Sequence, residues 1–148
     1  MLSALSKKSA RIAALIKDCA GQAHDPRYVG YFECFNQQLF YEAHDVLEEL
    51  WLAERAGPNN GFYKGLIQLA GAFVHLQKNR LRPAAALFKL ARKYLAAYPP
   101  IHEGLDLREV NAITEAWLGK LEASDFSRNP LEWEEAPKLK LRDESVNQ

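Results

Sequence analysis

The sequence predicts an all-α fold, a single compact bundle of about five to six helices followed by an irregular C-terminal tail. Apolar residues recur at helical spacing through most of the chain, and no stretch alternates with the period of two that marks a half-buried strand. Clusters of glycine, proline and asparagine fall between these periodic segments, where they predict turns. We therefore expect helices joined by short connections, and no sheet.

Turn and capping residues divide the chain into six expected helices. Asp25 and Pro26 are suited to be an N-cap and a first-turn proline, and Asp106 with Glu109 has the spacing of a capping box. Pro83 also suits a first turn. The expected helices begin near residues 3, 26, 39, 62, 83 and 106 and end near residues 19, 35, 51, 78, 98 and 121.

Each of the later helices has an apolar face that we assign to the core. The assignment follows the i, i+3, i+4 and i+7 spacing of large apolar residues. The expected inward residues are Tyr28, Tyr31, Phe32 and Phe35 in the second helix, Phe62, Leu66, Leu69, Phe73 and Leu76 in the fourth, Leu87, Leu90, Ala91, Tyr94, Leu95 and Tyr98 in the fifth, and Val110, Ile113, Trp117 and Leu121 in the sixth.

The composition is that of one ordinary globular domain. The 148 residues are 48% hydrophobic and 26% charged, and 19 basic residues balance 19 acidic ones. The zero net charge argues against nucleic acid or an anionic membrane as a general partner. No run of about 18 uncharged apolar residues occurs, and Lys7 and Lys8 interrupt the N-terminal apolar stretch, so we expect neither a membrane span nor a signal peptide. Two cysteines without C-x-x-C spacing fit a reducing compartment, and we expect a cytoplasmic protein.

We divide the chain into a helical domain over residues 1–126 and a tail over residues 127–148. The tail is polar and contains two prolines. We expect it to be extended, to pack through Leu131 and Trp133, and to be disordered in its last residues.

A polar pair interrupts the apolar stripe of the third helix. With His44 as the origin and about 100° per residue, Glu48 lies about 40° to one side. The apolar residues Phe40, Leu47 and Trp51 lie within about 60° on the other side. His44 is therefore expected in the middle of the stripe, where an unpaired polar group costs several kcal/mol. The pair must be hydrogen-bonded, bound to a ligand or open to a cleft.

Histidine and glutamate one helical turn apart can supply two ligands to a metal, so a third must come from another helix. Gln68 and His75 of the fourth helix share a face with Gly71, a small residue that allows a neighbouring helix to approach. His44 is either a metal ligand or a core histidine bonded to Glu48, to Gln68 or to a backbone carbonyl. His75 equally suits a face that is simply in contact with water.

Charged residues elsewhere have less specific interpretations. Glu42, Asp45 and Glu49 share the opposite face of the third helix, where they suit a hard cation or, more commonly, a solvated acidic surface. The basic residues within 78–93 could pair with such a surface, and as a signal for RNA they are weak. The N-terminal helix has a basic face that we expect to be solvated. Cys34 is interpreted as an apolar filler, and His24 and His102 as ordinary surface residues.

Two motifs of the chain resemble the domain-of-unknown-function family 309. They are E-A-H-x-x-x-E-x-x-W at residues 42–51 and G-L-I-Q-x-A at residues 65–70, and the resemblance extends over about residues 28–121. It implies a compact helical fold of small prokaryotic proteins, some of which are described as predicted metal-dependent hydrolases. The residues of interest that it implies are Glu42, His44, Glu48, Trp51, Gln68 and His75.

The first functional hypothesis is a helical protein that binds a metal or a small polar ligand, for example as a metal-dependent hydrolase. The metal would be a divalent ion of unknown identity, held by His44, Glu48 and His75. The metal would lower the pKa of a bound water, with Glu48 or Glu42 as the base. Gln68 and Trp51 would contact the unknown ligand.

The second hypothesis is a non-enzymatic interaction or scaffold protein. In this interpretation His44, Glu48 and Gln68 form a structural hydrogen-bond network that fixes the register of the helices. Aromatic surfaces would then mediate assembly into a homo-oligomer, and an exposed patch of tyrosines would support it. The residues proposed for that patch are Tyr28, Tyr31, Tyr94 and Tyr98.

Overall fold

The computed structural model of the chain describes residues 4–19, 21 and 23–142, and within them the fold is helical, as predicted. None of the helices in this part of the chain is both long and apolar enough to cross a membrane. The elements are α1 (Ala4–Ile16), a 3₁₀ turn η1 (Lys17–Cys19), α2 (Pro26–Asn36), α3 (Phe40–Ala53), α4 (Asn60–Gln77), α5 (Leu81–Leu95), β1 (Ile101–His102), β2 (Leu105–Asp106), α6 (Leu107–Ala123) and a second 3₁₀ turn η2 (Pro130–Glu132).

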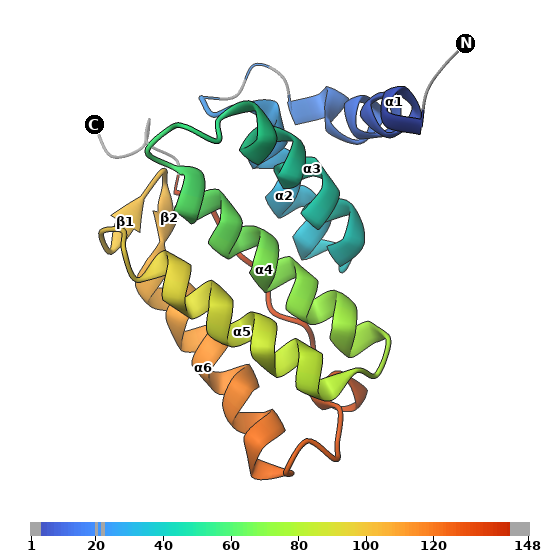
Figure 1. The fold of residues 1–148 in the computed structure, drawn as a ribbon, viewed down its shortest axis with the longest axis vertical. Helices are drawn as coiled ribbons and strands as arrows, with labels where there is room; N and C mark the ends of the chain where they lie inside the picture. Colours follow the sequence, from blue (N-terminus) through green and yellow to red (C-terminus); the bar gives the residue numbers. More distant parts are fainter. Residues whose placement is uncertain (1–3, 20, 22, 143–148) are drawn as a thin grey trace.

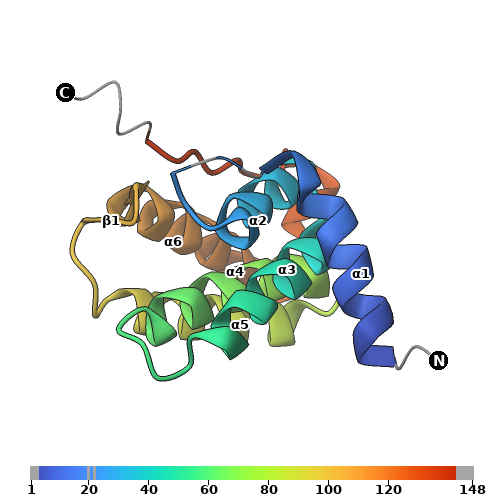
Figure 2. The same ribbon diagram turned by 90° about the horizontal axis from the view of Figure 1, so that it is seen from above.

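The helices form two layers. Helices α3, α4 and α5 lie side by side in one layer, and α2 and α6 lie behind them (Figures 1 and 2). The C-terminal segment, red in Figure 1, runs behind α4 between α2 and α6, so it completes the second layer. Helix α1 crosses the end of α2 and α3 and contacts no other helix extensively.

Local signals explain where the helices begin. The side chain of Asp25 accepts a hydrogen bond from the backbone N–H of Arg27, and Pro26 occupies the first turn of α2. Asp106 caps α6 in the same way, accepting from the backbone N–H groups of Arg108 and Glu109. The predicted bend between α2 and α3 is confirmed: Gln38 has a φ of 63°, which turns the chain out of α2.

The core is built around α4. The predicted inward face of this helix is buried, and Phe73 stacks on Phe40 with ring centroids 4.9 Å apart. Trp117 of α6 contacts the same ring edge-on at 5.1 Å. The predicted face of α5 is partly wrong: Leu90 is 37% exposed, whereas Phe88 is fully buried. The core stripe of α5 runs through alanines at 84, 85 and 91, which bring α5 close to α4.

The prediction that the chain contains no sheet is wrong at one point. Glu103 and Gly104 have φ values of 50° and 74°, and two successive residues of positive φ make a turn whose twist suits a hairpin. Strands β1 and β2 are therefore paired antiparallel, and Leu105 also bridges to Leu141 of the tail. His102 of β1 is not an ordinary surface residue, because its Nε2 lies 2.7 Å from the Asn59 Oδ1.

The tail packs on the body through residues other than those predicted. Leu131 contacts the core, as expected, but Trp133 is 47% exposed. Ala136 and Leu139 are buried instead. The residues expected to be disordered, at the end of the chain, lie outside the described residues from position 143 onward.

Candidate functional site

A pocket of about 160 Å³ lies where α3, α4 and the first half of α5 meet. It is half open, so a molecule can enter it from solvent. Three of the residues predicted from the sequence line it together. The lining residues are Tyr41 and His44 of α3, Gln68, Gly71, Val74 and His75 of α4, and Leu87 of α5.

Helical spacing places these side chains. On α4, residues 68, 71 and 75 follow one another at i, i+3 and i+7 and therefore share one face. Gly71 lets the side chain of Leu87 approach α4 closely, since a Cβ at this position would lie 3.0 Å from Leu87 Cδ1. On α3, Tyr41 and His44 are one turn apart, and their rings lie at 6.4 Å in a stacked arrangement.

His44 lies at the edge of the apolar stripe of α3, not in its middle as predicted. The buried residues of α3 are centred on Leu47, because this helix packs between α2 and α4. The side chain of His44 is 32% exposed, and its Nδ1 lies 3.3 Å from Asp45 Oδ1. An Nδ1–H that donates to this carboxylate leaves Nε2 as an acceptor. Nε2 lies 4.0 Å from Glu48 Oε2.

His75 is a second imidazole with an unused polar atom. Its Nδ1 is buried and has no hydrogen-bond partner among the described residues. Burial lowers the pKa of His75 below its ordinary value of 6.5, and the nearby positive charges of Arg80 and Lys78 lower it further. His75 is therefore neutral at pH 7, with one ring nitrogen able to accept.

Gln68 lines the pocket together with the two histidines. Within the described part of the chain its amide group bonds neither His44 nor Glu48. The predicted structural network of these three residues is thus present only as the contact between His44 and Glu48. The amide of Gln68 keeps both donor and acceptor capacity for a molecule in the pocket.

Glu48 is directed to helix α1 and does not line the pocket. Its Oε1 accepts a hydrogen bond from Lys8 Nζ at 3.0 Å. Among residues 4–19, 21 and 23–142, no group of three or more histidine, cysteine, aspartate or glutamate side chains is placed to hold a metal ion. The pocket therefore offers two imidazole nitrogens and an amide, one ligand short of the predicted set of His44, Glu48 and His75.

Glu42 and Trp51 do not line the pocket either. Glu42 is half-buried in the first turn of α3, and its charge adds to the burial that raises the pKa of Cys34 to about 11. Trp51 lies at the other end of α3. Its ring is contacted by the cationic groups of Arg55 and Lys64, each 5.3 Å from the ring centroid.

Asp45 does not lie on a solvated acidic face, which is where the sequence pattern places it. It is 4% exposed and lies under α1. Arg11 Nη2 approaches its Oδ2 to 2.6 Å, and Lys8 Nζ lies 3.7 Å from Oδ1. Asp45 and Glu48 are therefore paired with Lys8 and Arg11 of α1, whereas Glu49 lies 4.0 Å from Arg27 of α2. Among the described residues, none of these acids pairs with the basic segment 78–93.

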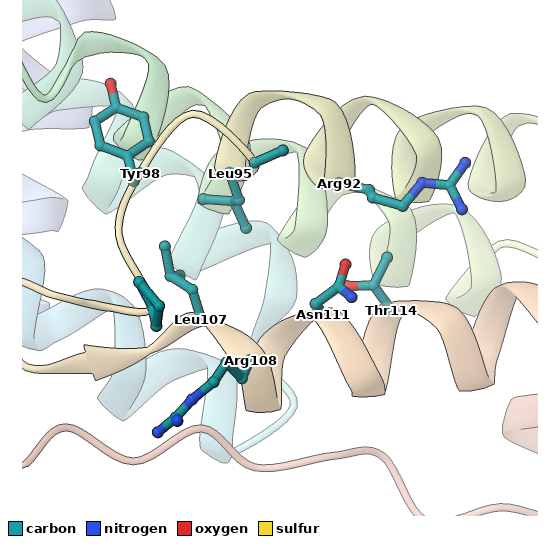
Figure 3. A pocket seen from close by; sticks show the side chains of 9 residues that line it. Arg92, Leu95, Tyr98, Leu107, Arg108, Asn111 and Thr114 are labelled. Atoms are coloured by element: carbon teal, nitrogen blue, oxygen red, sulfur yellow. The ribbon is translucent and has the colours of Figure 1, made fainter.

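A larger pocket, of about 290 Å³, was not predicted at all. It lies between the end of α5 and the start of α6, under the connection that leads to β1 (Figure 3). No local motif marks it, because its residues come from two helices and a connecting segment. They are Arg92, Leu95, Ala96, Tyr98, Pro100, Leu107, Arg108, Asn111 and Thr114.

Comparisons with known proteins agree with the motifs. The profile of the family described as "Domain of unknown function (DUF309)" matches residues 28–87. An uncharacterized protein of Aquifex aeolicus (strain VF5) is 32% identical over 88 residues, which are 60% of this chain and 26% of that protein. The chain thus spans about a quarter of the length of this relative. No solved structure matches the chain.

Proposed function

We propose that this chain, which carries the domain of unknown function DUF309 over residues 28–87, binds a small, neutral, polar molecule in its pocket. The description of the domain assigns no activity, so the proposal is drawn from the pocket itself. The observation that supports this proposal is the convergence of His44, Gln68 and His75 on one half-open cavity. All three lie within the matched family segment.

The volume and the polar groups limit the ligand. A cavity of this size corresponds to about five water molecules, so a ligand of about five or six non-hydrogen atoms fills it. The charges around it are of both signs: Asp45 and Glu48 lie beside His44, whereas Lys78 and Arg80 lie beside His75. A neutral molecule with hydroxyl or amide groups therefore suits the site better than an ion does.

The two histidines would recognise hydroxyl or amide hydrogens. His44 Nε2 accepts while its Nδ1–H is held by Asp45, and the neutral ring of His75 offers a second acceptor. Gln68, in the same lining, supplies a donor and an acceptor. The apolar floor of Gly71, Val74 and Leu87 would hold the carbon skeleton.

The proposal is tested by nuclear magnetic resonance of the histidine rings in the full chain. Glycerol and acetamide are the neutral probes, and acetate is the anionic one. We expect glycerol or acetamide to shift the ring signals of His44 and His75, but not those of His24 and His102. His44→Gln and Gln68→Leu should weaken the effect about tenfold, as loss of one buried hydrogen bond does, whereas His24→Gln is the matched control. If neither neutral probe moves the two rings, or if His24→Gln weakens binding equally, the proposal is wrong.

A metal-dependent hydrolase is a second candidate, favoured by the meeting of two imidazoles in one pocket. The donor set does not fit it well, because Glu48 bonds Lys8 and the described residues place no third histidine, cysteine, aspartate or glutamate beside the two imidazoles. We therefore derive no catalytic step. Metal analysis of chelator-free protein beside His44→Ala decides this candidate: near-stoichiometric metal that is lost in the variant would support it.

Assembly through exposed tyrosines has less support than expected. Tyr28 and Tyr31 are 2% and 0% exposed, so they belong to the core and not to a surface patch. Tyr94 and Tyr98 are half-buried. A homo-oligomer remains a prediction that sedimentation of the full chain would test.

A further inference from the structure

We propose that the pocket between α5 and α6 is a second binding site, and that it takes a small amphipathic carboxylate. The observation behind this proposal is the separation of polar and apolar groups within one cavity. Figure 3 shows Arg92, Asn111 and Thr114 on one side of the cavity, with the guanidinium of Arg92 extended along α5 past the other two side chains. Leu95, Leu107 and Tyr98 lie at the other end, and the side chain of Arg108 points away.

The polar end has donor capacity that the protein does not use. Arg92 donates through Nη1 to Glu115 Oε1 at 2.6 Å, and its Nη2 and Nε, which bond no other described residue, remain for a ligand. Thr114 is buried and donates its hydroxyl hydrogen to the Val110 carbonyl at 2.9 Å. That hydrogen is therefore not available to a carboxylate, and the amide of Asn111, which stands beside Thr114, supplies the second donor. None of the described residues that line the pocket is acidic.

The apolar end defines the rest of the ligand. Leu95 and Leu107 are 8% and 7% exposed, and Pro100 and the ring of Tyr98 complete the wall. The hydroxyl of Tyr98 is turned away from the pocket, since it donates to the Pro58 carbonyl at 2.9 Å. An aliphatic or aromatic body lies against these groups without leaving a polar atom unpaired.

Size and charge together select the ligand class. A volume of about 290 Å³ corresponds to roughly ten water molecules, which is the size of a molecule of about ten non-hydrogen atoms. A carboxylate suits the fork of a guanidinium better than a hydroxyl does, because it accepts two parallel hydrogen bonds. An unbranched or aromatic carboxylic acid of this size satisfies both ends of the pocket.

The site is distinct from the His44 pocket, which lies on the other side of α5 and shares no residue with it. The proposal for this pocket and the proposal for the His44 pocket can therefore be tested independently of each other. His44→Gln should leave binding at the second site unchanged.

Calorimetric titration of the full chain with octanoate and with octan-1-ol tests the proposal. Octanoate should bind at one saturable site and at least tenfold more tightly than octan-1-ol, because only the carboxylate engages Arg92. Arg92→Gln should remove this preference and leave octan-1-ol binding in place. Glu115→Gln breaks the same ion pair but keeps the guanidinium, so it should bind octanoate at least as tightly as the wild type does.

A rim substitution locates the site independently. Asn111→Trp places a bulky ring in the mouth and should weaken both probes about tenfold, while Ala112→Trp adds the same ring at an exposed neighbouring position outside the pocket. The proposal is overturned if octanoate does not saturate, if both probes bind equally, or if the two tryptophan variants behave alike.

Discussion

Asn36 holds the backbone of Leu139 with both ends of its amide group. Its Nδ2 donates to the Leu139 carbonyl and its Oδ1 accepts from the Leu139 N–H, each at 2.7 Å. A side chain at the end of α2 thus forms with the tail the pair of bonds that one strand forms with another. The tail is held as part of the second layer by a residue 103 positions earlier in the sequence.

Asn36→Ala should destabilise the protein by about 1–3 kcal/mol, because it leaves two backbone groups of a buried residue without partners. Urea denaturation measures the loss, and hydrogen exchange should show the Leu139 amide losing protection first. Gln37→Ala removes only an exposed bond to the Glu33 carbonyl, so it serves as the control and should change stability by less than about 0.5 kcal/mol.

Gly65→Ala and Gly119→Ala should have opposite effects. A Cβ at Gly65 would lie 2.7 Å from Leu95 Cγ and 3.2 Å from Tyr94 Cβ, so α4 and α5 must separate, at a cost of about 1–3 kcal/mol. Gly119 is exposed, and no heavy atom lies within 4 Å of the place that a Cβ would occupy, so alanine there gains about 0.5–1 kcal/mol of helix stability. Thermal unfolding of both variants checks the pair. Equal shifts of Tm in one direction would contradict the close packing.

Asp45→Asn should weaken the attachment of α1. The carboxylate is nearly buried and bonds Arg11 and Lys8, whereas its partners are partly exposed and can return to water. We therefore expect a loss of about 1–2 kcal/mol, below the full cost of an unpaired buried charge. Limited proteolysis between α1 and α2 should become faster. Glu134→Gln breaks the more exposed pair with Lys120 and should leave both readouts unchanged.

The lowered pKa of His75 predicts a pH dependence of stability. The neutral ring is favoured in the folded state, so its contribution is fully present above 6.5, the ordinary value. Stability should fall as the pH drops through 6.5 toward the folded pKa, and this change should level off below it. His75→Gln should flatten this part of the profile in urea titrations between pH 7.5 and 5. A His75 ring that titrates above 6.5 in the folded protein would refute the argument.

The parts of the fold that were predicted correctly depend on local chemistry. Asp25 and Asp106 cap the N–H groups that follow them in the chain, so the signal and its effect lie within a few residues. The face of α4 was predictable because large aromatic residues mark it. The face of α5 was predicted only in part, because three of its five buried residues are alanines while a large residue such as Leu90 lies toward solvent.

The candidate site, too, was predicted correctly only where local spacing determines it. Spacing on α3 and α4 was enough to bring His44, Gln68 and His75 to one pocket. The partner of Glu48 was not predictable, since Lys8 lies 40 residues away and only the docking of α1 brings it near. The α5–α6 pocket likewise arises where the chain wraps between helices, and no sequence period records it.

Helix α1 is held to the body largely by charge. Of its side chains from residue 7 onward, only Ile12 is buried, while the body beneath it has a continuous apolar core. Ionic strength therefore acts on the two parts differently. Near 1 M salt the Debye length falls to about 3 Å, which weakens the partly exposed ion pairs of Lys8 and Arg11 but leaves apolar burial intact. We therefore expect high salt to detach α1 before the remaining helices lose their packing.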